Sequence, residues 1–367
     1  MLRNVFFKIS PVSAVLLAVL ANPLPFSVRE QTHLTSRRNS STTPISQGLF
    51  GEFEELSRIV DITYCVGSLN TGVERPFQCL SYCRDFPTFE LRQTWNTGIT
   101  LQDSCGYVAL SHAPALPRII VAFRGTYSVA NAIADLSLTK QEYVPYPSRG
   151  RPEKCEGCRV HSGFYESWTQ SEAIIGDIVD ELVREYPGYK LTLAGHSLGG
   201  AVAALAGLDF RGRGYDPIVT TFGEPKVGNS ALARFFTKVG SDGLGLNGSR
   251  QTNIRQKFTA DTYRRVTHIH DPVPLIPLTQ WNYSQHAYEY YISSPQLPYA
   301  REDIHLCEGS EDMNCIAGDS PNALQLFRAH RDYFHRMGLC VPEDSFLRRI
   351  RLWDSVAGSE LPSDSVA

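Results

Sequence analysis

The chain has 367 residues, of which 42% are hydrophobic and 20% are charged, so it can bury a substantial core as one large domain or two small ones. The formal net charge of −3 argues against a nucleic-acid binder that relies on bulk positive charge. The same balance is compatible with an uncharged or lipidic substrate.

The first 21 residues have the pattern of a secretory signal peptide. Arg3 and Lys8 make the start basic, and residues 12–21 form an apolar run that ends in small residues. About ten apolar residues are too few to span a bilayer, although a signal anchor is the alternative. No other segment reaches transmembrane length. We therefore expect a secreted, extracellular protein without a transmembrane segment.

Residues 22–48 are rich in Ser, Thr and Pro, which is typical of a propeptide or linker. Arg37 and Arg38 in this stretch form a candidate dibasic processing site, or else a solvated basic pair. We expect the folded catalytic domain to span residues 49–342. The polar residues 343–367 are expected to form a C-terminal tail.

Hydrophobic periodicity divides the domain into alternating strands and helices. We predict helices at 50–64, 165–186, 197–212 and 228–239, and strands at 105–112, 118–124, 189–194, 218–222 and 263–269. This alternation predicts an α/β fold with a mainly parallel central sheet and helices on both faces. Residues 240–262, rich in Gly, Ser and Asn, are expected to form a surface insertion.

Nine cysteines in an exported chain predict disulfides with one cysteine left over. Three pairs are close in sequence, and a fourth pair sits near the two ends of the domain: Cys79 and Cys83, Cys155 and Cys158, Cys307 and Cys315, and Cys65 and Cys340. Cys105 would then be a buried free thiol. The C-x-x-C at 155–158 could instead mark a redox or zinc site, but no second C-x-x-C accompanies it.

N-glycosylation sequons occur at Asn39, Asn247 and Asn282, which fits an exported surface and a glycoprotein. A sequon permits modification without requiring it.

A polar turn follows the strand predicted at 189–194. Gly195, His196, Ser197, Leu198 and Gly199 form the pattern G-x-S-x-G, which between a strand and a helix is typical of a nucleophile elbow. Side chains at the two glycine positions would collide where strand and helix pack closely. The turn also places the serine at a helix N-terminus, where backbone N–H groups favour a developing negative charge. The alternative is a plain glycine turn with an N-capping serine.

A nucleophilic serine needs a base, and the base needs an orienting acid. In a nucleophile-elbow enzyme the acid follows the serine in the chain. Asp271 comes after the strand predicted at 263–269, at the carboxyl edge of the sheet, where sites gather. It could instead be an Asp–Pro turn residue, and Asp216 and Asp261 are alternatives with weaker placement.

The base is not fixed by spacing alone. Four histidines follow the candidate acid: His286, His305, His330 and His335. The last two lie so close together that only one of them is expected to face Ser197. His268 and His270 flank Asp271 too closely to be held by it across a site, and His196 is expected to be structural.

An acyl-transfer site also needs N–H donors for the oxyanion. The backbone N–H of Leu198 supplies one, and Thr126, after the strand predicted at 118–124, supplies a second together with a hydroxyl. This chemistry requires no metal and no cofactor.

Six stretches in order resemble the filamentous-fungal class 3 lipases, an α/β-hydrolase family of secreted triacylglycerol lipases, over roughly residues 50–340. They read "FRGTYSVANAIADL", "CEGCRVHSGFYESW", "GHSLGGAVAAL", "TFGEPKVGN", "HIHDPVPLIP" and "AHRDYF". The resemblance implies that the nucleophile is Ser197, the acid Asp271 and the base His330, because the family's histidine precedes a similar Tyr–Phe run. It also matches Thr126 and Leu198 to the oxyanion hole.

The resemblance further implies a single domain with a hinged lid helix at about residues 128–136, which includes Ser128, Val129, Ala132 and Ile133. Asp135 corresponds to an aspartate that supports the oxyanion threonine in some members. The pairs Cys65–Cys340, Cys79–Cys83 and Cys155–Cys158 match the family pattern, whereas Cys307–Cys315 is an addition of this chain.

The implied activity is serine-dependent hydrolysis of triacylglycerol esters at an oil–water interface by a monomeric enzyme. Some members carry a lid tryptophan where this chain has Ala132, which suits mono- and diacylglycerols, phospholipids or shorter esters as well. An aryl or feruloyl esterase on the same scaffold, and a catalytically silent binder of lipid or cell wall, are the rival hypotheses.

Overall fold

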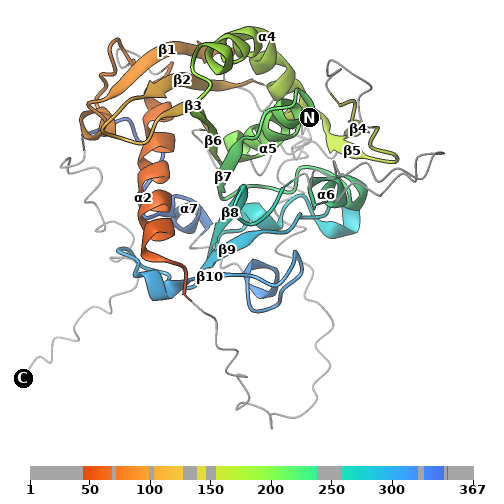
Figure 1. The fold of residues 1–367 in the computed structure, drawn as a ribbon. Coiled ribbons are helices and arrows are strands. Elements are labelled where there is room, and N and C mark those ends of the chain that lie inside the picture. The colour runs from red at the N-terminus through yellow and green to blue at the C-terminus, as the bar shows by residue number, and fades with distance from the viewer. Residues whose placement is uncertain are drawn as a thin grey trace, which may run out of the picture.

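The computed structural model describes residues 44–67, 72–98, 103–126, 139–145, 154–237, 258–320, 326–342 and 345 (Figure 1). The predicted signal peptide, lid, most of the predicted insertion and nearly all of the predicted tail lie outside these residues, as do the sequons at Asn39 and Asn247. Among the described residues, no helix has the length and apolar character that crossing a membrane requires.

The core of the molecule is an eight-stranded sheet in the order β1-β2-β3-β6-β7-β8-β9-β10. Strands β3, β6, β7, β8 and β9 run parallel, while β1, β2 and β10 pair antiparallel at the two edges. The strands are β1 Phe89–Asn96, β2 Cys105–Ser111, β3 Arg118–Phe123, β6 Lys190–His196, β7 Ile218–Phe222, β8 Tyr263–His268, β9 Glu289–Ile292 and β10 Ile304–Leu306.

Alternate residues of each strand enter different hydrophobic cores, which is the period-two pattern of a sheet covered on both faces. In β3, Ile119, Val121 and Phe123 enter one core, and Ile120 and Ala122 enter the other. The first core contains residues of helices α4 (Ser162–Glu185), α5 (Leu198–Gly212) and α6 (Ser230–Thr237), and the second contains residues of α2 (Gln47–Ile62). Figure 1 shows α2 on the opposite side of the sheet from α4 and α5.

Local sequence explains how these helices begin. Ser46 caps α2 by accepting a hydrogen bond from the Leu49 N–H at 3.2 Å. His161 caps α4 through its ring, which accepts from the Phe164 N–H at 3.3 Å. Helix α5 is rich in alanine and glycine and is buried along most of its length, so it packs closely on β6 and β7.

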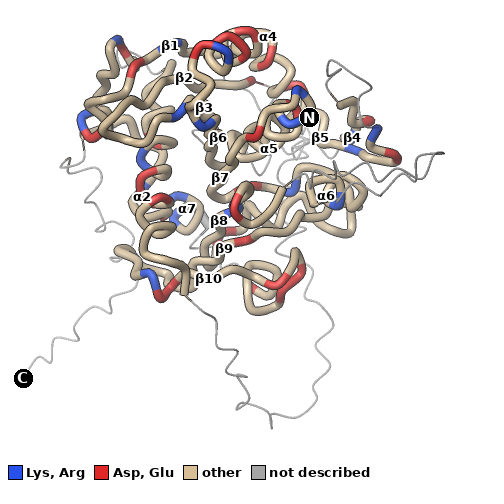
Figure 2. Tube along the Cα trace, viewed as in Figure 1, with Lys and Arg blue, Asp and Glu red and all other residues tan. Residues whose placement is uncertain are grey.

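The remaining elements are short. They are the hairpins β4 (Lys140–Glu142) with β5 (Arg159–His161) and β11 (Asp332–Tyr333) with β12 (His335–Arg336), the helix α7 (Leu326–Ala329), and the 3-10 turns η1 (Thr63–Cys65), η2 (Tyr82–Asp85), η3 (Val273–Leu275), η4 (Thr279–Trp281), η5 (Arg301–Asp303) and η6 (Ile316–Gly318). Lys and Arg are interspersed with Asp and Glu along the described chain (Figure 2), in keeping with the small net charge.

Two expected boundaries differ from the structure. The fold includes residues 44–48, because Ile45 is buried and its N–H bonds to Ile304, so the folded region begins before the expected position 49. The expected insertion at 240–262 ends earlier, because Phe258 is fully buried against Phe236 and Tyr263. In each case a polar composition concealed one buried hydrophobic residue, Ile45 in the first and Phe258 in the second.

Four disulfides join the chain: Cys65–Cys340, Cys79–Cys83, Cys155–Cys158 and Cys307–Cys315. Cys105 is a buried free thiol, and burial raises its pKa to about 11. The Cys65–Cys340 bond links the turn after α2 to the C-terminal segment across 275 residues of sequence. It therefore anchors the segment that carries His330.

Candidate active site

Ser197 lies in the tight turn between β6 and α5, at the carboxyl end of the parallel strands. Its φ of 58° and ψ of −127° are rare for a residue with a side chain and cost on the order of 1–3 kcal/mol. The Ser197 N–H donates to the Phe222 carbonyl at 2.9 Å, which ties the turn to the end of β7. The fold therefore holds this serine in a strained conformation.

The two glycines of the G-x-S-x-G pattern are required by close packing, as the sequence predicts. A Cβ atom on Gly195 would lie 2.1 Å from the Gly199 carbonyl oxygen. A Cβ atom on Gly199 would lie 2.4 Å from the Phe123 carbonyl oxygen, at the end of β3. Strand, turn and helix thus approach one another more closely than any side chain would allow.

Asp271 and His330 form a buried pair. The His330 Nδ1 atom lies 3.0 Å from both carboxylate oxygens of Asp271, and both side chains are fully buried. Asp271 also accepts hydrogen bonds from the Tyr333 hydroxyl at 2.5 Å and from the Val273 N–H at 2.9 Å. The carboxylate therefore has donors on both oxygens and fixes the orientation of the imidazole ring.

These partners determine the charge of Asp271. Burial alone would raise its pKa, but the electrostatic interaction with His330 and the hydrogen bonds from His330, Tyr333 and the Val273 N–H lower the pKa below its ordinary value. The carboxylate therefore stays ionised at neutral pH. An ionised acid is what a histidine base needs in order to gain a proton during catalysis.

The other histidines that the sequence left open have different partners. His286 pairs with Glu224 at 2.9 Å, His305 lies 3.6 Å from the Cys315 sulfur, and His335 lies 3.3 Å from the Ser57 hydroxyl. The structure therefore brings only His330 of the four against Asp271. The alternative acids are outside the site, since Asp216 forms surface ion pairs at the opposite ends of the strands and Asp261 is exposed.

The pair lies beside the serine turn. The ring of His196, the residue before Ser197, lies 4.6 Å from the ring of His330, measured between centroids. The Nε2 atom of His330 is buried and makes no hydrogen bond within the described part of the chain. This nitrogen is therefore available to a serine hydroxyl. Catalytic hydrogen bonds are often long in unliganded enzymes and shorten when the substrate binds.

His196 supports the backbone of His330, the candidate base. Its Nε2 atom lies 2.7 Å from the His330 carbonyl oxygen, and its Nδ1 atom lies 2.6 Å from the Tyr64 hydroxyl. Burial, together with the electrostatic interaction with neighbouring His330, lowers the pKa of His196 to about 3. A neutral ring satisfies both contacts by donating to the carbonyl and accepting from the hydroxyl. The structural role expected for His196 fits these contacts.

Gly223, which follows β7 and has a φ of +59°, is a site residue that the sequence did not predict. A Cβ atom on Gly223 would lie 2.9 Å from an Asp271 oxygen and 2.9 Å from the His330 Cε1 atom. Only glycine fits between the pair and the sheet. The sequence signal that could have identified Gly223 is its position directly after the strand predicted at 218–222, at the carboxyl edge of the sheet.

The loop after β3 lies against the serine turn. A Cβ atom on Gly125 would lie 2.9 Å from the Ser197 Cβ atom and 2.7 Å from the His196 carbonyl oxygen. The next residue, Thr126, has a buried hydroxyl with no hydrogen-bond partner among the described residues. Leu198, the first residue of α5, is also buried. The expected support residue Asp135 and the expected lid residues Ser128, Val129, Ala132 and Ile133 lie outside the described residues.

One cluster outside this site has donor atoms at a spacing that suits a metal. The ligand atoms of His305, Cys307 and Cys315 lie within 4.8 Å of one another. The two sulfurs are bonded together, however, so neither is the thiolate that a metal would require. The cluster is a covalent crosslink in this structure.

Comparison with known proteins agrees with this geometry. The family described as lipase (class 3) matches residues 120–281. "Lipase A" of Sodiomyces alcalophilus is 44% identical over 358 residues, which cover 82% of this chain and 84% of that protein. "Secreted mono- and diacylglycerol lipase 2" of Gibberella zeae is 43% identical over 377 residues, which cover 88% and 89%. The chain belongs to the class 3 lipase family.

Solved structures support the same assignment of this lipase. The Lip2 lipase of Yarrowia lipolytica superposes with a TM-score of 0.68 at 30% identity, over 82% of this chain and 98% of that one. The mono- and diacylglycerol lipase of Aspergillus oryzae superposes with a TM-score of 0.63 at 28% identity, over 81% and 100%. The protein is thus an α/β-hydrolase of the filamentous-fungal class 3 lipases, and it hydrolyses carboxylic esters of glycerolipids.

Replacing Gly223 with alanine should disable the lipase. The added methyl group would displace the Asp271–His330 pair, and misplacement by about 1 Å costs on the order of 100-fold in rate. Gly214→Ala is the matched control, because Gly214 has a φ of +92° but no atom within 4 Å of an added Cβ. Both variants should lose roughly 1–2 kcal/mol of stability in urea unfolding. A Gly223→Ala enzyme with wild-type kcat would contradict this role.

The depressed pKa of His196 predicts acid sensitivity. The folded pKa of about 3 lies below the ordinary value of 6.5, so the stabilisation is complete above pH 6.5 and is lost as the pH falls toward 3. The unfolded chain binds one extra proton in that window, which removes about 1.4 kcal/mol per pH unit. Urea unfolding between pH 7 and pH 4 should therefore show a shallower pH dependence in His196→Asn than in the wild type. Equal slopes would refute a neutral buried His196.

Proposed function

We propose that this lipase is secreted and hydrolyses mono- and diacylglycerols, with Ser197 as nucleophile, His330 as general base and Asp271 as the orienting acid. The observation that carries the proposal is the buried contact between the His330 Nδ1 atom and the Asp271 carboxylate, next to a strained serine turn. A serine becomes an effective nucleophile when such a pair removes its proton.

In the first step, the Ser197 oxygen attacks the ester carbonyl carbon while its proton passes to the His330 Nε2 atom. The resulting imidazolium is stabilised by the ionised Asp271, whose pKa is lowered by His330, Tyr333 and Val273 despite its burial. The tetrahedral intermediate then collapses. The glycerol-side oxygen leaves with the proton from His330, and the acyl group stays on the serine as an ester.

In the second step, water replaces the alcohol. His330 takes a proton from the water molecule as its oxygen attacks the acyl carbon, and the proton then returns to the Ser197 oxygen. The fatty acid is released and the enzyme is restored. The buried Nε2 atom of His330 is suited to these proton transfers, because it makes no hydrogen bond to any other group in the described part of the chain.

The oxyanion would be held by the backbone N–H groups of Leu198 and Thr126. Leu198 begins α5, where the helix dipole favours negative charge, and Thr126 follows Gly125, which packs on the serine turn. Asp135 would accept a hydrogen bond from the Thr126 hydroxyl and orient that loop. The buried hydroxyl of Thr126, unpaired among the described residues, supports this assignment.

Secretion is supported by the names of the relatives and by the N-terminal sequence. The Gibberella zeae and Penicillium cyclopium relatives are named secreted lipases. We infer a signal peptide at residues 1–21, a propeptide with a dibasic site at 37–38, a monomeric catalytic domain that follows it to about residue 342, and a polar tail.

Partial glycerides are favoured as substrates for two reasons. Relatives at 43% and 34% identity are named mono- and diacylglycerol lipases. The expected lid segment also carries Ala132, where some family members have tryptophan, so its sequence is only mildly apolar. A mildly apolar lid gains less from burial in a triacylglycerol surface than an aromatic lid would.

Initial rates on emulsified monoolein, diolein and triolein test this function. The wild type should act faster on the first two, and Ser197→Ala should lose activity on all three by about 10⁴-fold or more. Ser230→Ala is a matched control, because Ser230 also lies at the start of a helix, α6, but outside the site. A preference for triolein would overturn the substrate proposal alone. Near-normal turnover by Ser197→Ala would overturn the mechanism.

A further inference from the structure

Asp271 is the last residue of a tight turn that follows β8. The Asp271 N–H donates to the His268 carbonyl at 3.0 Å, and the third residue of this turn, His270, has a φ of +68°. Positive φ at the third position alone is the requirement of a type II turn, which glycine or asparagine normally meets. Histidine in this conformation costs on the order of 1–2 kcal/mol, so other contacts must stabilise the turn.

Asp319 supplies such a contact. Its carboxylate accepts a short hydrogen bond from the His270 backbone N–H, which the turn itself leaves unused. The other carboxylate oxygen lies 3.3 Å from the His270 Nδ1 atom. The Asp319 side chain is only 8% exposed, so this bond is largely shielded from water.

The segment that carries Asp319 is itself fixed. The Asp319 N–H donates to the Ile316 carbonyl at the end of η6, and the Ile316 N–H donates to the Glu289 carboxylate at 3.1 Å. Glu289 belongs to β9 and also accepts from Thr267 of β8 at 2.6 Å. The segment is therefore bonded to β9, which pairs with β8, the strand that leads into the turn of Asp271.

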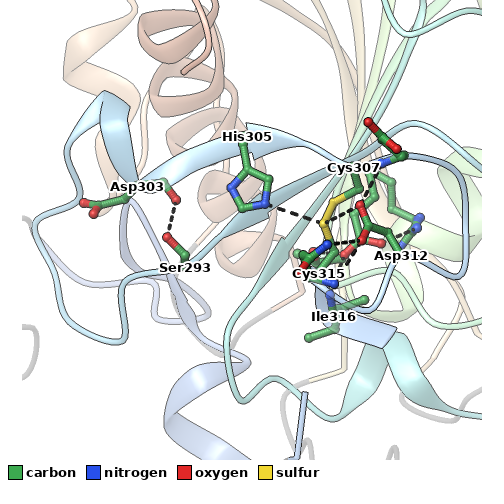
Figure 3. Close-up of a disulfide and its surroundings, with 12 residues drawn as sticks. Ser293, Asp303, His305, Cys307, Asp312, Cys315 and Ile316 are labelled. Carbon is green, nitrogen blue, oxygen red and sulfur yellow. Dashed lines mark hydrogen bonds and ion pairs between the residues drawn. A yellow bond between two sulfur atoms is a disulfide. The ribbon is translucent and has the colours of Figure 1, made fainter. Parts of the chain in front are cut away.

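The Cys307–Cys315 disulfide closes the same segment. Figure 3 shows the bond with His305 on one side and Asp312 on the other, and with Ile316 immediately after it. Cys307 and Cys315 pack with Ile316 and Tyr291 in a small core of their own, against which Leu275 of η3 is packed. The crosslinked loop thus contacts the chain on both sides of Asp271.

We propose that Asp319 is a positioning residue for Asp271 and that the Cys307–Cys315 loop holds it in place. Asp319 captures the His270 N–H, keeps the turn in its positive-φ conformation, and so holds the Asp271 carboxylate against the His330 Nδ1 atom. The inference rests on the proposed function in that Asp271 serves as the catalytic acid.

This role predicts a change in kcat with little change in KM, because Asp319 contacts the acid turn and not the substrate. Asp319→Ala should lower kcat by roughly 10- to 100-fold on a soluble short-chain ester. Asp319→Asn should stay within about threefold of the wild type, because its amide oxygen still accepts from the His270 N–H. The Cys307→Ser/Cys315→Ser double variant should also lose kcat.

Asp303→Ala is the matched control, because Asp303 caps the Ala300 N–H at 2.7 Å in the neighbouring turn η5. It should keep wild-type kcat. A kcat of Asp319→Ala within twofold of the wild type would overturn the proposal, as would a rise in KM at constant kcat. Equal losses in Asp319→Asn and Asp319→Ala would overturn the backbone-capping role.

A proton NMR measurement separates this inference from the proposed function. The low-field resonance of the His330 Nδ1 proton reports its bond to Asp271 whether or not the enzyme turns over an ester, and Asp271→Asn assigns it. The signal should weaken or shift in Asp319→Ala and persist in Asp319→Asn and Asp303→Ala. An unchanged signal in Asp319→Ala would overturn the positioning role, whereas an inactive wild type with these signals would overturn only the proposed function.

Discussion

The site depends on a fully buried carboxylate. An ionised Asp271 without partners would be too costly to bury, and it is stable here because His330, Tyr333 and the Val273 N–H all donate to it. Two of these donors lie in the C-terminal segment, and the third, Val273, begins η3 two residues after Asp271. Folding of the C-terminal segment and ionisation of the acid are therefore coupled.

The C-terminal segment is held by contacts far from the site. Gly338 donates its N–H to the buried carboxylate of Asp61 in α2 at 2.7 Å, and Cys340 is bonded to Cys65 just after that helix. Tyr299 donates to the Asp332 carbonyl at 2.7 Å. Helix α2 thus covers one face of the sheet and also anchors the chain that presents His330.

Glycine packing explains why three strand ends meet at one point. Gly125 follows β3, Gly195 lies near the end of β6, and Gly223 follows β7. A Cβ atom on Gly125 or Gly195 would clash with the serine turn or the start of α5, and one on Gly223 would clash with the Asp271 and His330 side chains. Side chains at these positions would force the strand ends apart. Ser197, the loop that carries Thr126 and the Asp271–His330 pair converge because these positions carry no side chain.

Much of this arrangement is readable from the sequence. The strand predicted at 218–222 has the bounds of β7, and the elbow at Ser197 follows from local spacing and glycine sterics. Strands β1, β9 and β10 were not predicted, because their register depends on pairing with distant strands.

The choice among four histidines could not come from spacing, because partners such as Glu224 for His286 are brought together only by the fold. Only the family resemblance favoured His330. Likewise, nothing local to Asp319 reveals that it caps a turn 49 residues away. The sequence alone could not predict these hydrogen bonds, because each joins segments that are distant in the chain.

The central claim is that the buried Asp271–His330 pair activates Ser197. The most direct test is the rate of labelling by a serine-directed organophosphonate, with the modified residue located by peptide mass spectrometry. In the wild type the adduct should form on Ser197, and Asp271→Asn should slow its formation by on the order of 1,000-fold or more. An adduct on another serine, or equal labelling rates in the two proteins, would contradict the account.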